Sequence, residues 1–252
     1  MTTAPPIEAE VLPSGLDGLL VRFSRTPDPA AMAAARRFAA ALEAAPPKEL
    51  AGGQAEIAPA LVSVLVRFDL ERTDRAALRS TLERIAGATV QGPLDMPDPA
   101  RRWTVPVAFG GDQGPQLGQV ARALGIGEDA AVAEICASDL RVLTIGFAPG
   151  QPYIGLLPPR WDLPRLPEIT PSVPAGSVVV AVRQIVLFGA DSATGWQLVG
   201  RAALRTFVPD RADPMPLQGG DAIRFARATA DEIARLSDAG DRMGGARLEV
   251  LR

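Results

Sequence analysis

The sequence predicts an α+β protein with two domains: an α+β domain at residues 1–99 and an antiparallel β-barrel domain at residues 100–252. In the first hundred residues strand-like and helical patterns alternate, whereas beyond residue 137 short apolar runs follow one another between turn residues. Between these regions, residues 91–100 are rich in Pro, Asp and Gly, which is typical of a domain boundary. A hydrophobic content of 47% is sufficient for two cores.

The first domain is predicted to contain two capped helices among short strands. Asp28 suits an N-cap, Pro29 suits the first helical turn, and the alanine-rich run ends at Ala45 before two prolines. Thr73 is the predicted cap of the second helix and Gly87 its predicted end. The expected elements are strands at 8–12 and 19–23, a helix at 29–45, strands at 55–58 and 61–68, and a helix at 74–86.

The second domain is expected to be mostly β. Many short strands without a sustained helical pattern favour a closed or nearly closed antiparallel barrel, and the few helices do not alter that expectation. The expected elements are a strand at 103–108, helices at 116–124 and 128–137, strands at 140–145, 177–182, 185–188, 197–199 and 222–225, a helix at 231–236, and a strand at 248–251.

Composition excludes several kinds of chemistry. The chain has no histidine and one cysteine, so it cannot by itself form a Ser-His-Asp or Cys-His arrangement, an ordinary zinc site or an internal disulfide. No metal site is evident. A phosphate loop of the G-x-x-x-x-G-K-[ST] type is also absent, so a nucleotide site would depend largely on a partner.

Charge and hydropathy argue against nucleic acid and membrane partners. The net charge is -3, whereas proteins that bind nucleic acid or anionic membranes through bulk electrostatics usually carry a basic face. The N-terminal residues lack the basic and apolar regions of a signal peptide, and the apolar stretch at 57–66 is well short of the roughly 20 residues that span a bilayer. We therefore expect a cytoplasmic protein.

The segment 145–201 is the candidate functional region. It holds 8 of the 24 prolines and 7 of the 24 glycines, yet it also contains apolar runs that a linker would lack. Residues 148–151 (Ala-Pro-Gly-Gln) fit a type II turn, and residues 173–176 (Val-Pro-Ala-Gly) fit a type I turn that brings Ser177 to the mouth of a strand. The two turns form either a cradle of backbone N–H donors for an anion or a polarised carbonyl, or simply tight turns of a barrel.

Four side chains have both a functional and a structural interpretation. Tyr153 and Trp196 suit stacking or hydrogen bonding to a small planar ligand, and they equally suit core packing. Arg165 suits a carboxylate or phosphate ligand, although a surface arginine needs no ligand. Cys136 closes a predicted helix and is more simply a small buried residue than a nucleophile, because no imidazole is available to activate it.

Five sequence blocks in one order resemble the family that comprises the B component of 5-oxoprolinase, the kinase inhibitor KipI and allophanate hydrolase subunit 1. The family blocks are F-x-P-G-F-P-Y, P-R, V-P-A-G-S-V, S-P-G-G-W-x-(L/I)-(I/V)-G-R and G-D-x-(V/I)-R-F. The resemblance covers about residues 103–226 well. The corresponding segments of this chain are 147–153, 164–165, 173–178, 192–201 and 220–225.

The resemblance implies an N-terminal ferredoxin-like domain and a C-terminal cyclophilin-like barrel. It further implies a larger partner similar to the C component of 5-oxoprolinase or to allophanate hydrolase subunit 2, a possible third subunit, and ATP used together with these partners. The implied reaction is the ATP-dependent opening of the 5-oxoproline lactam to glutamate, so the expected ligand is a small lactam or amide. Two alternatives stay open: a KipI-like inhibitor of a sensor histidine kinase, and half of a carboxyltransferase module of the urea carboxylase type.

The site expected from these blocks combines backbone corners with a few side chains. Ser177 and Tyr153 are the candidate catalytic residues. The candidate substrate-binding residues are Gly150, Gln151, Pro152, Arg165, Gly176, Gly195 and Trp196.

The chain departs from the family mainly at polar positions. Together these departures indicate an altered substrate or a non-catalytic paralogue, while the retained glycines and prolines favour the same fold and the same docking between subunits. Gln151 occupies the position of phenylalanine in the Pro-Gly-Phe turn. The other departures are Gln116 for aspartate, Cys136 for histidine, Ser172 for arginine, Phe188 for tyrosine, and Ala193 and Thr194 for a Pro-Gly pair.

Overall fold

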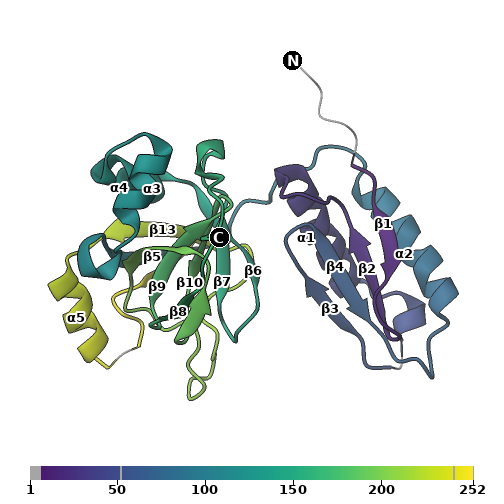
Figure 1. Cartoon of the computed structure of the whole chain (residues 1–252). Coiled ribbons are helices and arrows are strands. Elements are labelled where there is room, and N and C mark those ends of the chain that lie inside the picture. The colour runs from purple at the N-terminus through teal and green to yellow at the C-terminus, as the bar shows by residue number, and fades with distance from the viewer. Residues whose placement is uncertain (1–6, 52, 241, 252) are drawn as a thin grey trace. The chain divides into compact units, whose positions relative to one another are not determined.

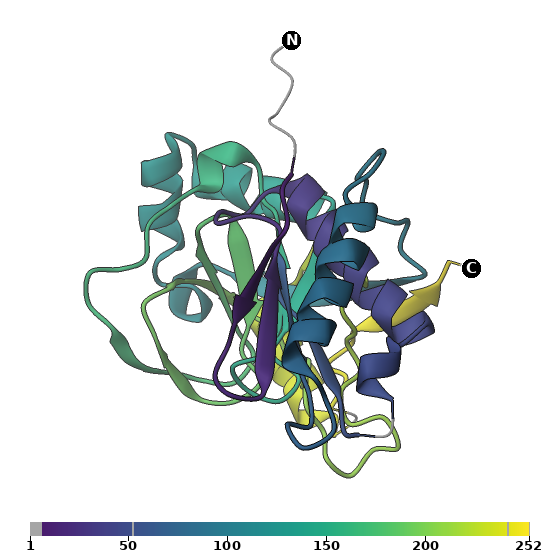
Figure 2. The ribbon, with the colours of Figure 1, turned by 90° about the vertical axis from the view of Figure 1, so that its right-hand side faces the viewer.

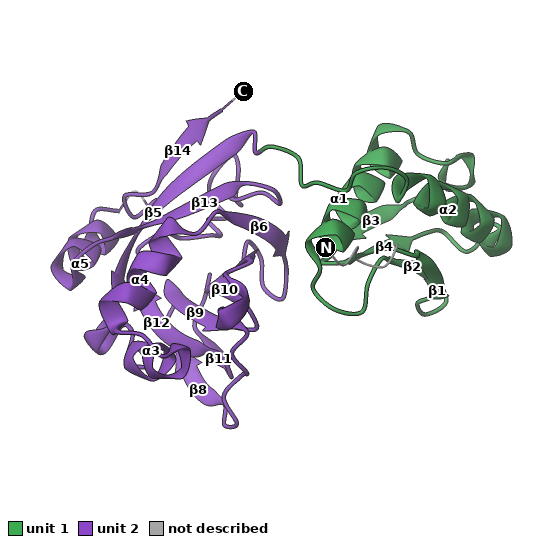
Figure 3. Cartoon of the chain, turned by 90° about the horizontal axis from the view of Figure 1, so that it is seen from above, with its two compact units in different colours: residues 1–98 green, residues 99–252 purple. Residues whose placement is uncertain are grey.

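The computed structural model describes residues 7–51, 53–240 and 242–251. The chain divides into two compact units, Met1–Asp98 and Pro99–Arg252 (Figures 1 and 3). The absence of a signal peptide was predicted mainly from residues 1–6. These residues lie outside the described part of the chain.

Unit 1 is a four-stranded antiparallel sheet covered by two helices. The strand order is β1-β2-β4-β3. Helices α1 and α2 lie side by side on one face of this sheet (Figure 2). The elements are β1 (Glu10–Pro13), β2 (Gly18–Arg22), α1 (Pro29–Ala44), a short 3₁₀ helix (Lys48–Leu50), β3 (Glu56–Pro59), β4 (Ser63–Arg67) and α2 (Arg75–Thr89).

The helix caps of unit 1 explain where its two helices begin. The Asp28 carboxylate accepts a hydrogen bond of 2.9 Å from the Ala31 N–H, with proline at the first helical position, as predicted. In α2 the cap is Asp74, not the predicted Thr73. The helix also continues past Gly87, the predicted end. A glycine inside a helix costs only about 1 kcal/mol relative to alanine, so it does not by itself end the helix.

Unit 2 is a closed seven-stranded barrel. Its strands follow the order β12-β9-β10-β7-β6-β13-β5, and β5 pairs with β12 to close the ring. Strand β14 extends the sheet at β5, and β8 and β11 form a separate two-stranded sheet. The strands are β5 (Arg101–Phe109), β6 (Leu140–Ile145), β7 (Pro152–Gly155), β8 (Thr170–Val173), β9 (Ser177–Ala181), β10 (Gln184–Leu187), β11 (Ser192–Thr194), β12 (Gln197–Arg201), β13 (Ala222–Arg227) and β14 (Arg247–Val250).

The barrel is not wholly antiparallel, which corrects the prediction. Strands β5 and β13 run parallel, with Trp103 opposite Ile223 and Val105 opposite Phe225. A parallel pair needs a long crossover, and here that crossover contains most of the barrel together with α3 (Leu117–Leu124) and α4 (Glu128–Ala137). Helix α5 (Ala230–Asp238) follows β13 directly.

Side chains of the barrel strands alternate between two apolar clusters. Val178 and Val180 of β9 point into the main core of unit 2, which also holds Trp161 and Phe225. Val179 on the same strand belongs instead to a smaller outer cluster. The outer cluster contains Val173, Val179, Ala181, Val186, Phe188 and Trp196, with Tyr153, Val182 and Leu198 packed against it. The candidate site lies on this outer face.

Candidate functional site

A hollow of about 280 Å³ lies over the outer cluster of unit 2, and we refer to it as the aromatic pocket. Tyr153 reaches it from β7, Val186 from β10, and Ala193 and Thr194 from β11, whereas the other lining residues lie in loops or next to strand ends. Its lining residues are Phe147, Gln151, Tyr153, Arg165, Val186, Phe188, Ala193, Thr194, Gly195 and Trp196.

The aromatic side chains and one arginine give this pocket its character. The rings of Tyr153 and Trp196 meet edge to face, with centroids 6.1 Å apart and planes at 74°. The Arg165 guanidinium carbon lies 5.6 Å from the centre of the Trp196 ring. Phe147 is 80% exposed and adopts a φ of +69°, so an aromatic ring stands at the surface beside the hollow. This combination suits a small planar ligand that carries negative charge.

Arg165 is exposed, and none of the carboxylates that the structure describes forms an ion pair with it. Ten other arginines of the described segments do form ion pairs: Arg22, Arg25, Arg67, Arg72, Arg79, Arg101, Arg102, Arg160, Arg227 and Arg242. The Arg165 guanidinium is therefore available to an anionic group of a ligand.

The structure brings together five of the nine predicted site residues. Gln151, Tyr153, Arg165, Gly195 and Trp196 all line the aromatic pocket. The other four, Gly150, Pro152, Gly176 and Ser177, do not line it.

The first predicted turn is present, and it packs against the protein. The Gln151 N–H donates to the Ala148 carbonyl at 3.1 Å, and Gly150 has a φ of +69°, as a type II turn requires. A Cβ at position 150 would lie 2.1 Å from the Thr206 carbonyl oxygen. The corner is therefore pressed against the segment after β12, and Gly150 is buried.

The second predicted turn differs in both position and type. The Ser177 N–H donates to the Pro174 carbonyl at 3.1 Å and Gly176 has a φ of +86°, so a type II turn spans 174–177 in place of the predicted type I turn at 173–176. Its other donors are used within the protein. The Ala175 N–H donates to the Asp191 carboxylate at 2.8 Å, and the Gly176 N–H donates to the Phe188 carbonyl at 2.8 Å. Of the two interpretations left open from the sequence, the structure supports the tight turn here, because the N–H groups of Ala175, Gly176 and Ser177 are all used within the protein.

Ser177 does not reach the surface that the sequence suggested. The residue is fully buried, and its hydroxyl has no hydrogen-bond partner among the described residues. The buried Thr206 hydroxyl also has no hydrogen-bond partner among the described residues. Ser177 begins β9, as expected, but β9 is buried along its whole length, so the catalytic role of Ser177 stays a prediction.

The positions that depart from the family pattern have different environments. The Gln116 side-chain oxygen accepts from the Leu198 N–H, and the Gln116 N–H donates to the Leu198 carbonyl at 3.0 Å, so this side chain anchors α3 to β12. Phe188 is 5% exposed and lines the aromatic pocket, whereas Ser172 is exposed on β8. Cys136 is half-buried against the main core.

Cys136 is expected to be a slow nucleophile. Burial raises the pKa of its thiol above the ordinary value, and the nearby Arg227 only partly opposes this effect. Alkylation by iodoacetamide at pH 8 should therefore be several-fold slower in the native protein than in the denatured chain, and the native rate should rise more steeply at higher pH. Equal rates in the two states would contradict this expectation.

Five lining residues were not singled out as site residues from the sequence: Phe147, Val186, Phe188, Ala193 and Thr194. The signal for Phe147 was available, because an aromatic residue directly before a Pro-Gly turn is placed at a loop surface. The left-handed backbone that turns it outward has no such signal, since phenylalanine rarely adopts a positive φ.

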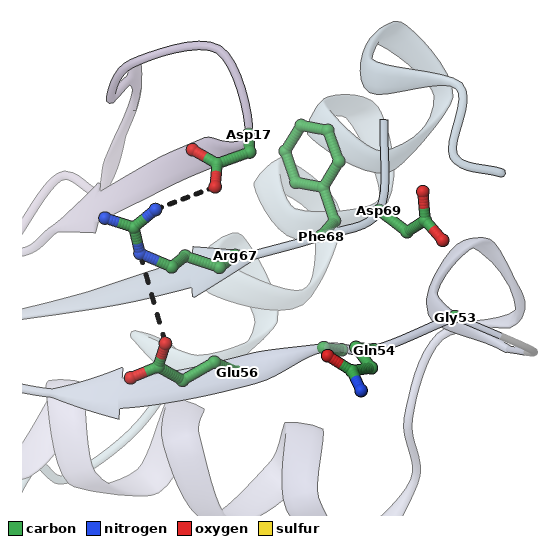
Figure 4. Close-up of a pocket in the computed structure, with 8 residues that line it drawn as sticks. Asp17, Gly53, Gln54, Glu56, Arg67, Phe68 and Asp69 are labelled. Atoms are coloured by element: carbon green, nitrogen blue, oxygen red, sulfur yellow. Dashed lines mark hydrogen bonds and ion pairs between the residues drawn. The ribbon is translucent and has the colours of Figure 1, made fainter. Parts of the chain in front are cut away.

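Unit 1 contains a larger and more open hollow of about 720 Å³ beside the edge of its sheet (Figure 4). Arg67, the basic residue of the lining, lies 2.7 Å from the Asp17 carboxylate and 4.0 Å from that of Glu56, so it is already paired within the protein. None of the predicted site residues lies there. We therefore place the candidate site at the aromatic pocket of unit 2.

The described residues contain no group of three or more His, Cys, Asp or Glu side chains arranged to hold a metal ion. Within the same residues, no helix combines the length and apolar character needed to cross a bilayer.

Comparison with known proteins defines the class of this chain. The family model described as "Carboxyltransferase domain, subdomain C and D" matches residues 9–217, so the chain belongs to this family. It is 39% identical over 121 residues to the B component of 5-oxoprolinase from Escherichia coli O157:H7, a match that covers 48% of this chain and 56% of that protein. The chain spans about half the length of the curated relatives it matches.

Solved structures show the same fold. A crystal structure of TTHA0988 superposes with a TM-score of 0.67 at 30% identity, covering 84% of this chain and 40% of that chain. The urea amidolyase of K. lactis superposes with a TM-score of 0.77 at 18% identity, covering 98% of this chain and 16% of that chain. At this low identity the second likeness concerns the fold alone.

Proposed function

We propose that the chain is the smaller subunit of an ATP-dependent hydrolase of cyclic amides, resembling 5-oxoprolinase, which converts 5-oxoproline to glutamate. The observation that carries this proposal is the aromatic pocket, because it combines a planar apolar wall with an arginine that has no ionic partner among the described residues. The similarity to proteins named as the B component of 5-oxoprolinase supports the same substrate class.

Three side chains of the pocket have assigned roles in this proposal. Arg165 holds the carboxylate of the lactam, and Trp196 provides a face for its ring. The Tyr153 hydroxyl donates to the amide carbonyl, which stabilises negative charge on that oxygen when water attacks the carbon. The chain has no histidine to act as a general base, so we propose that a larger partner supplies the reactive groups and most of the ATP site.

The proposal places the protein in the cytoplasm, and it includes finer fold assignments: a ferredoxin-like unit 1 and a cyclophilin-like unit 2. The topology of unit 1 supports the first assignment. Strand β4 lies between β2 and β3 in the sheet, so β2, α1 and β3 form a split βαβ unit, and β1 occupies the remaining edge.

Carboxyl transfer is the second candidate, because the description of the matching family names that activity. The same pocket would then hold a urea-like or carboxylated substrate. Dependence of turnover on a biotinylated partner would favour this candidate over lactam hydrolysis.

The decisive experiment is to purify the tagged chain from its native extract and to identify the proteins that accompany it. The reconstituted complex is then supplied with ATP and 5-oxoproline, and glutamate formation is measured. ATP-dependent glutamate formation that needs both proteins supports the proposal. The proposal is refuted if the chain retains no partner. It is also refuted if the reconstituted complex turns over no lactam.

Two substitutions in the pocket should impair the reconstituted complex in different ways. We expect Tyr153→Phe to lower kcat about 100-fold, because it removes a donor to the developing oxyanion. Arg165→Gln should instead raise KM by about tenfold, because it removes a charge-assisted contact to the substrate carboxylate. Steady-state kinetics measures both effects.

The matched control for these variants is Arg205→Gln, since Arg205 is exposed and does not line the pocket. All three variants should unfold like the original chain. Unchanged kcat and KM in both pocket variants would refute the assigned roles.

A further inference from the structure

Gln151 is a buried polar side chain in the wall of the aromatic pocket. The residue is 2% exposed. Its backbone is fully used, because its N–H donates to Ala148 at 3.1 Å and its carbonyl accepts from Gly146 at 3.1 Å. What Gln151 offers to a ligand is therefore its side-chain amide.

The amide of Gln151 makes no hydrogen bond to any residue that the structure describes. Gln151 and Tyr153 are two residues apart where the chain enters β7, and side chains at this spacing in an extended chain point to the same face. Tyr153 packs on the outer cluster. Both observations agree with the position of Gln151 in the lining of the pocket. Among the described residues only Arg101 Nε, Ser177 Oγ and Thr206 Oγ1 are fully buried side-chain atoms without a partner, so the Gln151 amide keeps contact with the open space of the pocket, where a ligand can pair with it.

The chemistry of the amide determines what can pair with it. A glutamine side chain carries one acceptor and two donors, so along one edge it presents an oxygen beside an N–H. The complementary group must present an N–H beside a C=O on the same side. Lactams, primary amides and ureas do so because their amide is cis or carries a syn hydrogen, whereas ordinary peptide bonds are trans. Lactones and esters lack the donor altogether.

We propose that Gln151 determines specificity by pairing, through two parallel hydrogen bonds, with the cis amide edge of a small carboxylate ligand. This inference rests on the proposed function and deepens it, since it specifies the part of the ligand that this chain recognises. Arg165 lies in the same lining and binds the carboxylate. The pocket accordingly selects cyclic amides, primary amides and ureido acids over esters of the same shape.

The test compares three probes of nearly equal shape on the full chain by titration calorimetry, with ligand-observed NMR for weak binding. The probes are 5-oxoproline, its N-methyl derivative and the corresponding lactone, tetrahydro-5-oxofuran-2-carboxylate. We expect 5-oxoproline to bind about tenfold or more tightly than either analogue, because each analogue leaves the glutamine oxygen unpaired. In Gln151→Leu the three affinities should become equal to within about twofold.

Two further variants make the test specific. Gln119→Leu is the matched control, since Gln119 is exposed on α3 and does not line the aromatic pocket, and it should keep the original preference. Gln151→Glu preserves shape but replaces the donor by a carboxylate, so it should lose 5-oxoproline binding. Gln151→Leu should unfold at about the same denaturant concentration as the original chain, because the substitution removes no hydrogen bond between the Gln151 amide and the described residues.

The possible failures are distinguishable. If 5-oxoproline binds and Gln151→Leu keeps the preference for the lactam, the assignment of Gln151 is wrong while the proposed function stands. The same conclusion follows if the original chain binds lactam and lactone equally. If neither the chain nor its reconstituted complex binds any of the probes at millimolar concentration, the proposed function fails together with this inference.

Discussion

Gly150→Ala is expected to destabilise unit 2 by about 3 kcal/mol or more. Two causes act together. The φ of +69° is unfavourable for any residue with a Cβ, which costs roughly 1–2 kcal/mol. In addition, the new Cβ would lie 2.1 Å from the carbonyl oxygen of Thr206. The backbone at Gly150 and the backbone at Thr206 must therefore move apart. Because the neighbouring Gln151 lines the aromatic pocket, ligand binding should be lost as well.

Tryptophan fluorescence measures this effect without interference from unit 1. All three tryptophans of the chain, Trp103, Trp161 and Trp196, belong to unit 2. Unfolding in urea followed by their emission therefore gives the stability of that unit.

Two control glycines separate the causes of the loss at Gly150. Gly125 has a φ of +70° with open space around it, so Gly125→Ala should cost only the backbone strain, about 1 kcal/mol. Gly146 has neither a positive φ nor a close neighbour, so Gly146→Ala should be nearly neutral. A loss at Gly150 no greater than that at Gly125 would show that the contact with Thr206 relaxes easily.

Elements whose signals are local were predictable from the sequence. The cap at Asp28 with the proline that follows it defined the start of α1, and the bounds of α4 and β6 were predicted as they are found. Helical periodicity and capping operate within a few residues, so a single sequence carries them.

Three strands escaped prediction because only their partners make them strands. Strand β7 begins with Pro152 and ends with Gly155, β8 contains Pro171, and β11 has three residues. Proline and glycine are poor strand formers, so each segment had the composition of a loop. The pairing of β7 with β6 and β10 in the barrel, and of β8 with β11 in the separate sheet, is a property of the fold that no local pattern contains.

The candidate site was partly predictable for the same reason. Aromatic and charged residues beside prolines and glycines indicated one candidate surface, and Gln151, Tyr153, Arg165, Gly195 and Trp196 do line one hollow. The direction of the turn N–H groups was not predictable, since their acceptors, at Phe188 and Asp191, lie more than ten residues away in the chain. A turn type determines local geometry, whereas the fold determines which donors remain free.

Asp221→Ala is expected to lower the free energy of unfolding of unit 2 by about 3–5 kcal/mol, because it removes the acceptor of a buried polar network. The Asp221 carboxylate is 5% exposed. It accepts from the Arg101 guanidinium at 2.9 Å, from the Trp103 indole N–H at 3.1 Å and from the Gln218 N–H at 2.9 Å. Asp221 directly precedes β13, and the two side chains that it binds come from β5, so the network secures one end of the parallel pair.

Two comparison variants define what the loss at Asp221 means. Asp221→Asn keeps an oxygen for the indole and the backbone donor but removes the charge beside Arg101, so it should cost less, on the order of 1–2 kcal/mol. Asp139→Ala is the control, since Asp139 is an exposed acid before β6, and it should change stability by less than about 0.5 kcal/mol. Urea unfolding monitored by tryptophan emission ranks the three variants. If Asp221→Ala proves as mild as Asp139→Ala, water must replace the carboxylate at the donors of Arg101 and Trp103, and the stability of the β5–β13 pair does not depend on this network.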